Sequence, residues 1–142
     1  MSSNLVREDL VIHTPGRGMV EITREVAGRV ESSGLAEGLC TVFVHHTSAS
    51  LIVSENADPD VLRDLEMYFS QLVPDGDPRY LHTDEGPDDM PSHVRSALTL
   101  TSVSIPVGDG RVDLGTWQAV YLWEHRHAPH RRRVSLTVQG SP

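Results

Sequence analysis

The sequence contains no lysine, because all twelve basic residues among its 142 positions are arginines. Without a lysine amine the chain cannot form a Schiff base, use a lysine general base or build a Walker-type phosphate loop. It contains one cysteine, Cys40, which excludes an internal disulfide framework and is typical of a reducing compartment. The apolar neighbours of Cys40 predict a buried thiol. We therefore expect a cytoplasmic protein.

Long apolar runs and a broad basic surface are also missing. No stretch approaches the roughly 18 apolar residues of a membrane span, and no basic leader precedes an apolar run, so we expect neither membrane insertion nor export. The net charge is -8, and residues 55–89 hold eleven acidic side chains against two arginines. Four arginines gather in residues 126–133, too few for the basic face of a nucleic-acid binder. That cluster either serves one phosphate group or is a solvated strand start.

Apolar runs separated by turn residues predict a chain made mainly of strands. The predicted strands cover residues 5–12, 19–22, 38–46, 49–54, 101–107, 111–114, 117–125 and 133–138. Helical spacing predicts three helices, the first capped by Thr23, the second by Asp58, and the third opening at residues 88–91. Because no regular strand–helix–strand repeat is present, we predict an α+β fold with a largely antiparallel sheet or β-sandwich and two to three helices. One domain, residues 1–142, is expected.

Eight histidines are present, and two of them occupy suggestive positions. His82 lies in the acidic stretch, and His93 lies eleven residues later in the first turn of the third predicted helix. Zinc binds imidazole nitrogens, and catalytic zinc sites typically keep three protein ligands and one open position. Glu85, Asp88 and Asp89 lie between the two histidines, and carboxylates commonly orient metal-bound imidazoles. The alternative is that these histidines are surface or capping residues.

Two other short patterns have ambiguous meanings. His46, Thr47 and Ser48 place hydroxyls beside a base, as a serine hydrolase requires, but neighbouring strand residues point to opposite faces. The Gly-Thr-Trp-Gln run at residues 115–118 suits a polar turn that binds a ligand, or an ordinary strand entry. Neither pattern alone assigns a function.

Taken together, several segments resemble one family. They are Val-His-His-Thr-Ser-Ala-Ser at residues 44–50, Glu-Asn-Ala-Asp-Pro at 55–59, Glu-Gly-Pro-Asp-Asp-Met-Pro-Ser-His at 85–93, Asp-Gly-Arg at 109–111, Leu-Gly-Thr-Trp-Gln at 114–118 and Tyr-Leu-Trp-Glu-His-Arg at 121–126. These segments recur in order across nearly the whole chain. The sequence thereby resembles the YjbQ-like (UPF0047) family, to which a secondary thiamine-phosphate synthase activity has been assigned.

The resemblance implies an α+β fold with a β-sandwich, assembled as a homotrimer, with a metal site near the subunit boundaries. Carried over residue by residue, it implies a divalent metal ion, zinc, with three histidine ligands: His46, His82 and His93. It implies ligand contacts at six polar positions: Asn56, Asp89, Thr116, Gln118, Glu124 and Arg132. In an enzyme, Glu124 or Asp89 would transfer a proton. His45, His125 and His127 depart from the family pattern and are left out of this site.

Three functions fit these expectations. The first is a metal-assisted enzyme acting on a small phosphorylated molecule, such as a thiamine-phosphate synthase-like transferase, with Arg132 contacting the phosphate. The second is a non-catalytic trimer that binds a metal or metabolite. The third is a metal-dependent phosphoester hydrolase. Dependence of turnover on His82 and His93 separates the enzymes from the binder.

Overall fold

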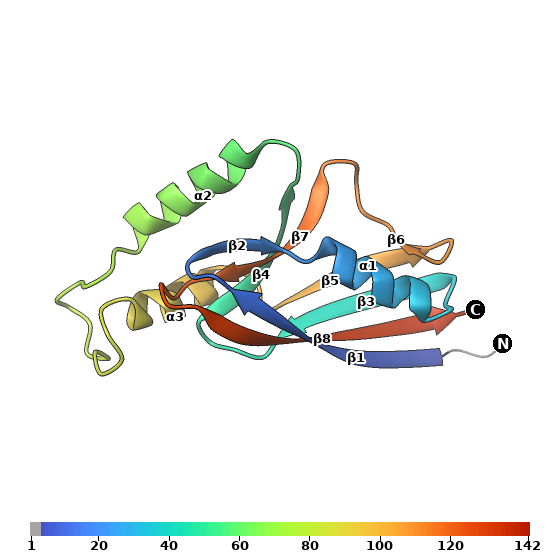
Figure 1. Ribbon diagram of the computed structural model, residues 1–142, viewed down its shortest axis with the longest axis horizontal. Coiled ribbons are helices and arrows are strands. Elements are labelled where there is room, and N and C mark those ends of the chain that lie inside the picture. Colours follow the sequence, from blue (N-terminus) through green and yellow to red (C-terminus); the bar gives the residue numbers. More distant parts are fainter. Residues whose placement is uncertain (1–3) are drawn as a thin grey trace.

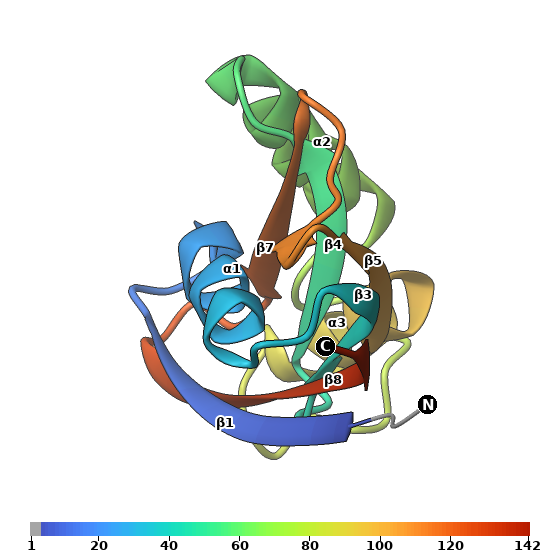
Figure 2. The same ribbon diagram turned by 90° about the vertical axis from the view of Figure 1, so that its right-hand side faces the viewer.

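The computed structural model describes residues 4–142 and consists of two antiparallel sheets with three helices (Figures 1 and 2). The larger sheet has the strand order β1-β8-β3-β5-β6, and the smaller has the order β2-β7-β4. The strands are β1 (Asn4–Thr14), β2 (Gly18–Glu21), β3 (Glu37–Val44), β4 (Ala49–Glu55), β5 (Ser102–Gly108), β6 (Arg111–Val112), β7 (Gln118–Glu124) and β8 (His130–Ser141). The predicted α+β class with antiparallel sheets is confirmed.

The three helices are α1 (Thr23–Ser32), α2 (Pro59–Leu72) and α3 (Asp89–Leu98). Asp58 caps α2 as predicted, because its side chain accepts a hydrogen bond of 2.9 Å from the Asp60 N–H. The predicted Thr23 cap is wrong. The helix begins at Thr23 itself, and the Thr23 hydroxyl accepts a hydrogen bond from the Val120 N–H of β7 instead.

The hydrophobic core lies between the two sheets and is closed by one face of α1. Val26 and Val30 of α1 are fully buried there, together with inward-facing residues of both sheets such as Leu51, Leu122 and Leu136. Removing apolar side chains from water is the main driving force for this packing, about 1.5–3 kcal/mol for each fully buried aliphatic side chain. This packing fixes the positions of the strands, and therefore of the strand ends that carry the polar loops.

Helix α2 stands away from this core (Figure 1). None of the residues in Pro59–Leu72 is buried, although Phe69 packs edge-on against Trp123 of β7 with ring centroids 4.8 Å apart. Tyr68 and Leu72 of the same helix are more than half exposed. In residues 4–142, no helix has the length and apolarity needed to cross a membrane.

Candidate metal centre

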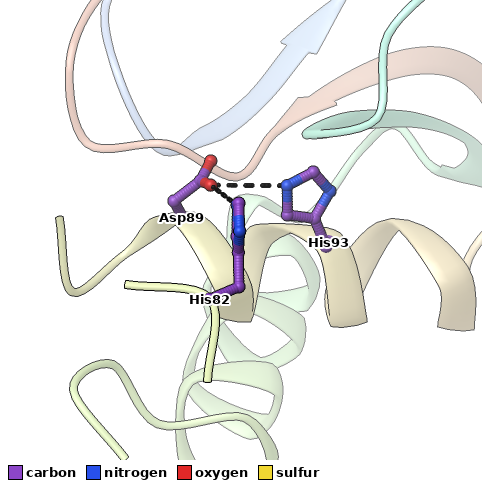
Figure 3. A group of neighbouring side chains, drawn as sticks. All are labelled: His82, Asp89 and His93. Carbon is purple, nitrogen blue, oxygen red and sulfur yellow. Dashed lines mark hydrogen bonds and ion pairs between the residues drawn. The ribbon is translucent and has the colours of Figure 1, made fainter. Parts of the chain in front are cut away.

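Two histidines and one carboxylate converge beside α3 (Figure 3). His82, Asp89 and His93 each offer one ligand atom, and these three atoms lie within 4.8 Å of one another. His82 Nε2 lies 2.8 Å from Asp89 Oδ2, and His93 Nε2 lies 3.4 Å from the same oxygen. The Asp89 carboxylate is buried, whereas half of the His82 side chain is exposed. One side of the group is therefore accessible from solvent.

The local sequence explains why these side chains meet. Asp89 and His93 are four residues apart in α3, so they lie on the same face of the helix. His82 comes from the loop that joins α2 to α3, and a hydrogen bond of 3.0 Å from the Gly76 N–H to the Pro87 carbonyl draws this loop together. Gly86 adopts a φ of 103°, a backbone conformation that favours glycine, just before α3 begins.

Arg126 holds the acidic end of α3 in place. Its Nη1 donates to Asp89 Oδ1 at 2.9 Å, its Nε donates to Asp88 Oδ2 at 3.0 Å, and its Nη2 donates to the Glu85 carbonyl. Burial raises the pKa of Asp88, but the hydrogen bonds from Arg126 and the His127 N–H outweigh it and lower that pKa to about 2. With Oδ1 engaged by Arg126, Asp89 directs Oδ2 to the two histidines.

The spacing of the three ligand atoms suits a metal ion. Ligand atoms about 2.0–2.1 Å from a tetrahedral zinc ion are separated from one another by roughly 3.3 Å. The observed separations from Asp89 Oδ2, 2.8 and 3.4 Å, lie close to that value. Two imidazole nitrogens and a carboxylate oxygen are also a donor set found in catalytic zinc sites. The three ligand atoms, all within 4.8 Å of one another, thus offer the donors for a divalent ion, which would replace the hydrogen bond between His82 Nε2 and Asp89 Oδ2.

His46, the predicted third histidine ligand, is not part of this group within one chain. Its Nε2 accepts a hydrogen bond of 2.7 Å from the Arg133 N–H of β8. Burial and the nearby Arg132 guanidinium lower the pKa of His46, so the imidazole is neutral at neutral pH. The prediction of three histidines is thus not confirmed, and Asp89, predicted as a proton carrier, stands at the third position.

Glu124 and Arg132, predicted to transfer a proton and to bind phosphate, contact each other. Arg132 Nε donates to Glu124 Oε1 at 2.8 Å, and its Nη2 donates to Glu124 Oε2 and to Ser48 Oγ. Glu124 is fully buried and also accepts hydrogen bonds from the Thr14 hydroxyl and the Arg126 N–H. Burial raises the pKa of Glu124, but these bonds lower it overall, so the pair is a salt bridge at neutral pH.

Asn56, Thr116 and Gln118, the predicted ligand contacts, lie at the other end of the small sheet. Asn56 Nδ2 donates to the carbonyls of Thr116 and Gln118, and Gln118 Oε1 accepts from the Gly115 N–H. Gln118 begins β7, whereas Glu124 ends it, two residues before Arg126. Six residues of strand span on the order of 20 Å. Within one chain Asn56, Thr116 and Gln118 therefore lie apart from the other predicted site residues.

Sequence reasoning missed a buried polar network beside the core. Arg95 of α3 is fully buried, and it donates to His125 Nδ1 at 2.9 Å and to Glu66 Oε2 at 2.6 Å. His125 Nε2 bonds Ser50 Oγ at 2.8 Å. The sequence gives only one indication of this network, an arginine among apolar residues of a short helix. An arginine on an exposed helix face produces the same pattern.

Comparisons with known proteins agree with this fold. The chain matches the family model described as UPF0047 protein YjbQ-like over residues 8–141. It is 57% identical over 134 residues to the UPF0047 protein sll1880 of Synechocystis sp., covering 94% of this chain and 91% of that protein. It is 40% identical over 135 residues to the UPF0047 protein YjbQ of Escherichia coli O157:H7, covering 94% and 97%.

Two solved structures have the same architecture. The conserved hypothetical protein TT1486 of Thermus thermophilus matches with a TM-score of 0.79 and 36% identity, over 91% of this chain and 97% of that one. A YbjQ-like protein of unknown function from Sulfolobus solfataricus P2 matches with a TM-score of 0.87 over 99% and 100%, and its 23% identity makes it evidence for the fold alone. From the family match and the two sequence relatives, the chain belongs to the YjbQ-like UPF0047 family.

Proposed function

We propose that His82, Asp89 and His93 bind a divalent metal ion, zinc, and that the resulting centre acts on a small phosphorylated molecule. The observation that carries the proposal is the approach of two imidazole nitrogens and one carboxylate oxygen to within 4.8 Å on a solvent-accessible side of α3. An ion bound there would supply Lewis-acid chemistry, because it polarises an oxygen of water or of a phosphoryl group.

The residues around the group have defined tasks in this proposal. Arg126 fixes the carboxylate of Asp89 and so orients Oδ2 toward the two Nε2 atoms. A bound ion would replace the hydrogen bond between His82 Nε2 and Asp89 Oδ2. The exposed edge of His82 leaves room for a fourth ligand from the substrate or from water. Glu124 and Arg132 are outside the proposed chemistry, because their polar atoms hold each other in a buried salt bridge.

The charges around the group support a metal-dependent interaction with phosphate. Residues 75–89 contain six acidic residues and one arginine, Arg79, whose guanidinium pairs with Asp77. Arg126 is already engaged by Asp88 and Asp89. A free phosphate would be repelled here unless a bound cation offset these charges. Phosphorylated ligands should therefore bind only to the metal-loaded protein, as either a transferase such as a thiamine-phosphate synthase or a hydrolase requires.

A homotrimer completes the proposal. The exposed face of α2, with Tyr68 and Leu72, and the 63% exposed Trp117 are apolar surfaces that a second copy would cover. In such an assembly the distant polar group of Asn56, Thr116 and Gln118 from one subunit can face the metal centre of the next.

Sedimentation equilibrium should give three times the 15.7 kDa of one chain. A monomer at micromolar concentration would contradict this arrangement.

Zinc titration tests the metal ligands. In isothermal calorimetry we expect one zinc ion per chain, with an affinity that falls at least about 100-fold in His82→Ala, because one of three ligands is lost. The matched control is His127→Ala, since His127 is also exposed and also lies 2.8 Å from a carboxylate, that of Asp75. Equal losses in the two variants would show that zinc binds nonspecifically to surface histidines.

Turnover then separates an enzyme from a binder. Metal-dependent release of phosphate from a generic phosphoester such as p-nitrophenyl phosphate, lost in His82→Ala, would identify hydrolysis. Zinc binding at one site per chain without turnover of phosphoesters or of thiamine precursors would favour the non-catalytic binder. One observation favours this non-catalytic function: Glu124, the predicted proton carrier, is fully buried.

A further inference from the structure

A cavity of about 300 Å³ lies in the loop between α2 and α3, directly beside the candidate metal centre. Its walls include Pro78, Tyr80, Pro87 and Met90, and His82 forms part of the same lining. Backbone hydrogen bonds hold these walls together, from Gly76 to Pro87 and from Tyr80 to Asp77. Because these hydrogen bonds lie within the loop itself, the fold of the loop defines the shape of the cavity.

The cavity and the metal centre share their boundary. His82 belongs to both, and Met90 follows Asp89 directly in α3. Figure 3 shows the His82 ring standing between the loop and the start of α3, with His93 beyond it. A molecule bound to an ion at His82, Asp89 and His93 would thus have the cavity as its neighbour.

The size and chemistry of the walls restrict that group. An apolar cavity of about 150 Å³ is enough to hold benzene, so this one has room for a single ring with a short substituent. Two prolines, a tyrosine ring and a methionine offer flat apolar contacts, and methionine sulfur packs well against aromatic rings. The charged group in the lining, Asp77, is paired with Arg79, which lowers the pKa of Asp77 to about 2.

The surroundings of the cavity disfavour a negatively charged group. Asp75, Asp84 and Glu85 flank the loop, and no cation of residues 4–142 lines the cavity. A carboxylate or phosphate placed inside would lose its hydration against a largely apolar lining that offers it no arginine. An uncharged apolar ring has no charge to desolvate on entering, and the removal of its surface from water favours binding.

We propose that this cavity binds an uncharged, ring-sized apolar group, carried by the same molecule whose polar end binds the metal centre. The inference rests on the proposed function, since it takes the metal ion as the anchor for the polar end. It adds the substrate class: molecules that join a metal-binding head to one small ring are preferred over molecules with the same head and no ring.

Two hydroxamates test this preference by binding rather than by activity. Acetohydroxamate and benzohydroxamate carry the same metal-binding head, and only the second carries a ring. With zinc-loaded protein in isothermal calorimetry, we expect benzohydroxamate to bind about 10- to 100-fold more tightly, the gain from burying one ring. The affinity ratio of the two compounds is the measured quantity.

Variants of the walls show whether the cavity is the source of that ratio. Tyr80→Ala removes an apolar wall, and Met90→Gln replaces the thioether by an amide of similar size. Each should lower the ratio at least fivefold while leaving the affinity for acetohydroxamate within about twofold of the wild type. Leu5→Ala, which removes an exposed apolar side chain from β1, is the control and should leave the ratio unchanged.

The outcomes separate this inference from the metal centre. A ratio close to one in the wild type, or a ratio that both wall variants leave unchanged, would overturn the inference while acetohydroxamate binding still supports the metal centre. Failure of zinc itself to bind would overturn the metal centre, and the inference with it.

Discussion

Replacing Glu124 by alanine is expected to lower the free energy of unfolding by about 3–5 kcal/mol. The Glu124 carboxylate is fully buried and accepts hydrogen bonds from Arg132, Thr14 and the Arg126 N–H. Its removal leaves the Arg132 guanidinium, which is 4% exposed, without an opposite charge in a region that water reaches poorly. Most of the loss is the cost of that uncompensated charge, and not the net value of the salt bridge.

An exposed ion pair provides the comparison. Glu8 lies 2.9 Å from Arg29, and both side chains are 44% exposed. Glu8→Ala should therefore cost less than about 1 kcal/mol, because water solvates the remaining arginine. Urea unfolding at pH 7 measures both values. If the two variants lost similar stability, the buried salt bridge would not be the structural element that this geometry indicates.

Acidification should destabilise the protein through His125. Burial, and then the neighbouring Arg95, lower the pKa of His125 to about 2, against roughly 6.5 in an unfolded chain. Above pH 6.5 the imidazole is neutral in both states, and the full stability is present. Between pH 6.5 and about 2 only the unfolded chain binds the proton. The free energy of unfolding then falls by about 1.4 kcal/mol per pH unit from this residue alone.

The variant His125→Gln isolates that contribution. Glutamine keeps an acceptor for Arg95 but does not titrate, so the variant should be less stable at pH 7 and should lose less stability on acidification. We expect the difference in unfolding free energy between the wild type and His125→Gln to shrink by about 2.5 kcal/mol between pH 6.5 and 4.5. Metal-free protein, prepared with a chelator, keeps metal release out of the measurement. Parallel curves would mean that His125 is protonated in the folded state.

Much of the fold could be predicted because its signals are local. Alternating apolar residues marked the strands, and an aspartate before proline marked the start of α2, where Asp58 does cap the helix. The Thr23 cap failed because a tertiary contact, the Val120 N–H, takes the hydroxyl. The lengths of β1 and β8 were underestimated for a similar reason. Their polar ends pair with each other from Asn4–Gly140 to Thr14–His130, and such residues carry no strand signal alone.

The candidate site was predictable only where its residues share one element. Asp89 and His93 lie four residues apart in a helix, and the acidic loop brought His82 into consideration. Which third side chain joins the two histidines depends on how loops and strand ends meet in the folded chain. Within one chain His46 is hydrogen-bonded to β8, and the side chain beside His82 and His93 is Asp89. The separation of Asn56 and Gln118 from the histidines follows from the register of β4 and β7, Glu55 opposite Gln118 and Ala49 opposite Glu124, which no single segment reveals.

The measurement that tests the metal centre most directly is elemental analysis of the purified protein beside the His82→Ala/His93→Ala double variant. We predict close to one transition-metal ion per chain in the wild type, and none in the double variant, with both proteins showing the same circular dichroism. A wild type that holds no metal even after reconstitution with zinc would contradict the central claim, as would a folded double variant that retains its ion.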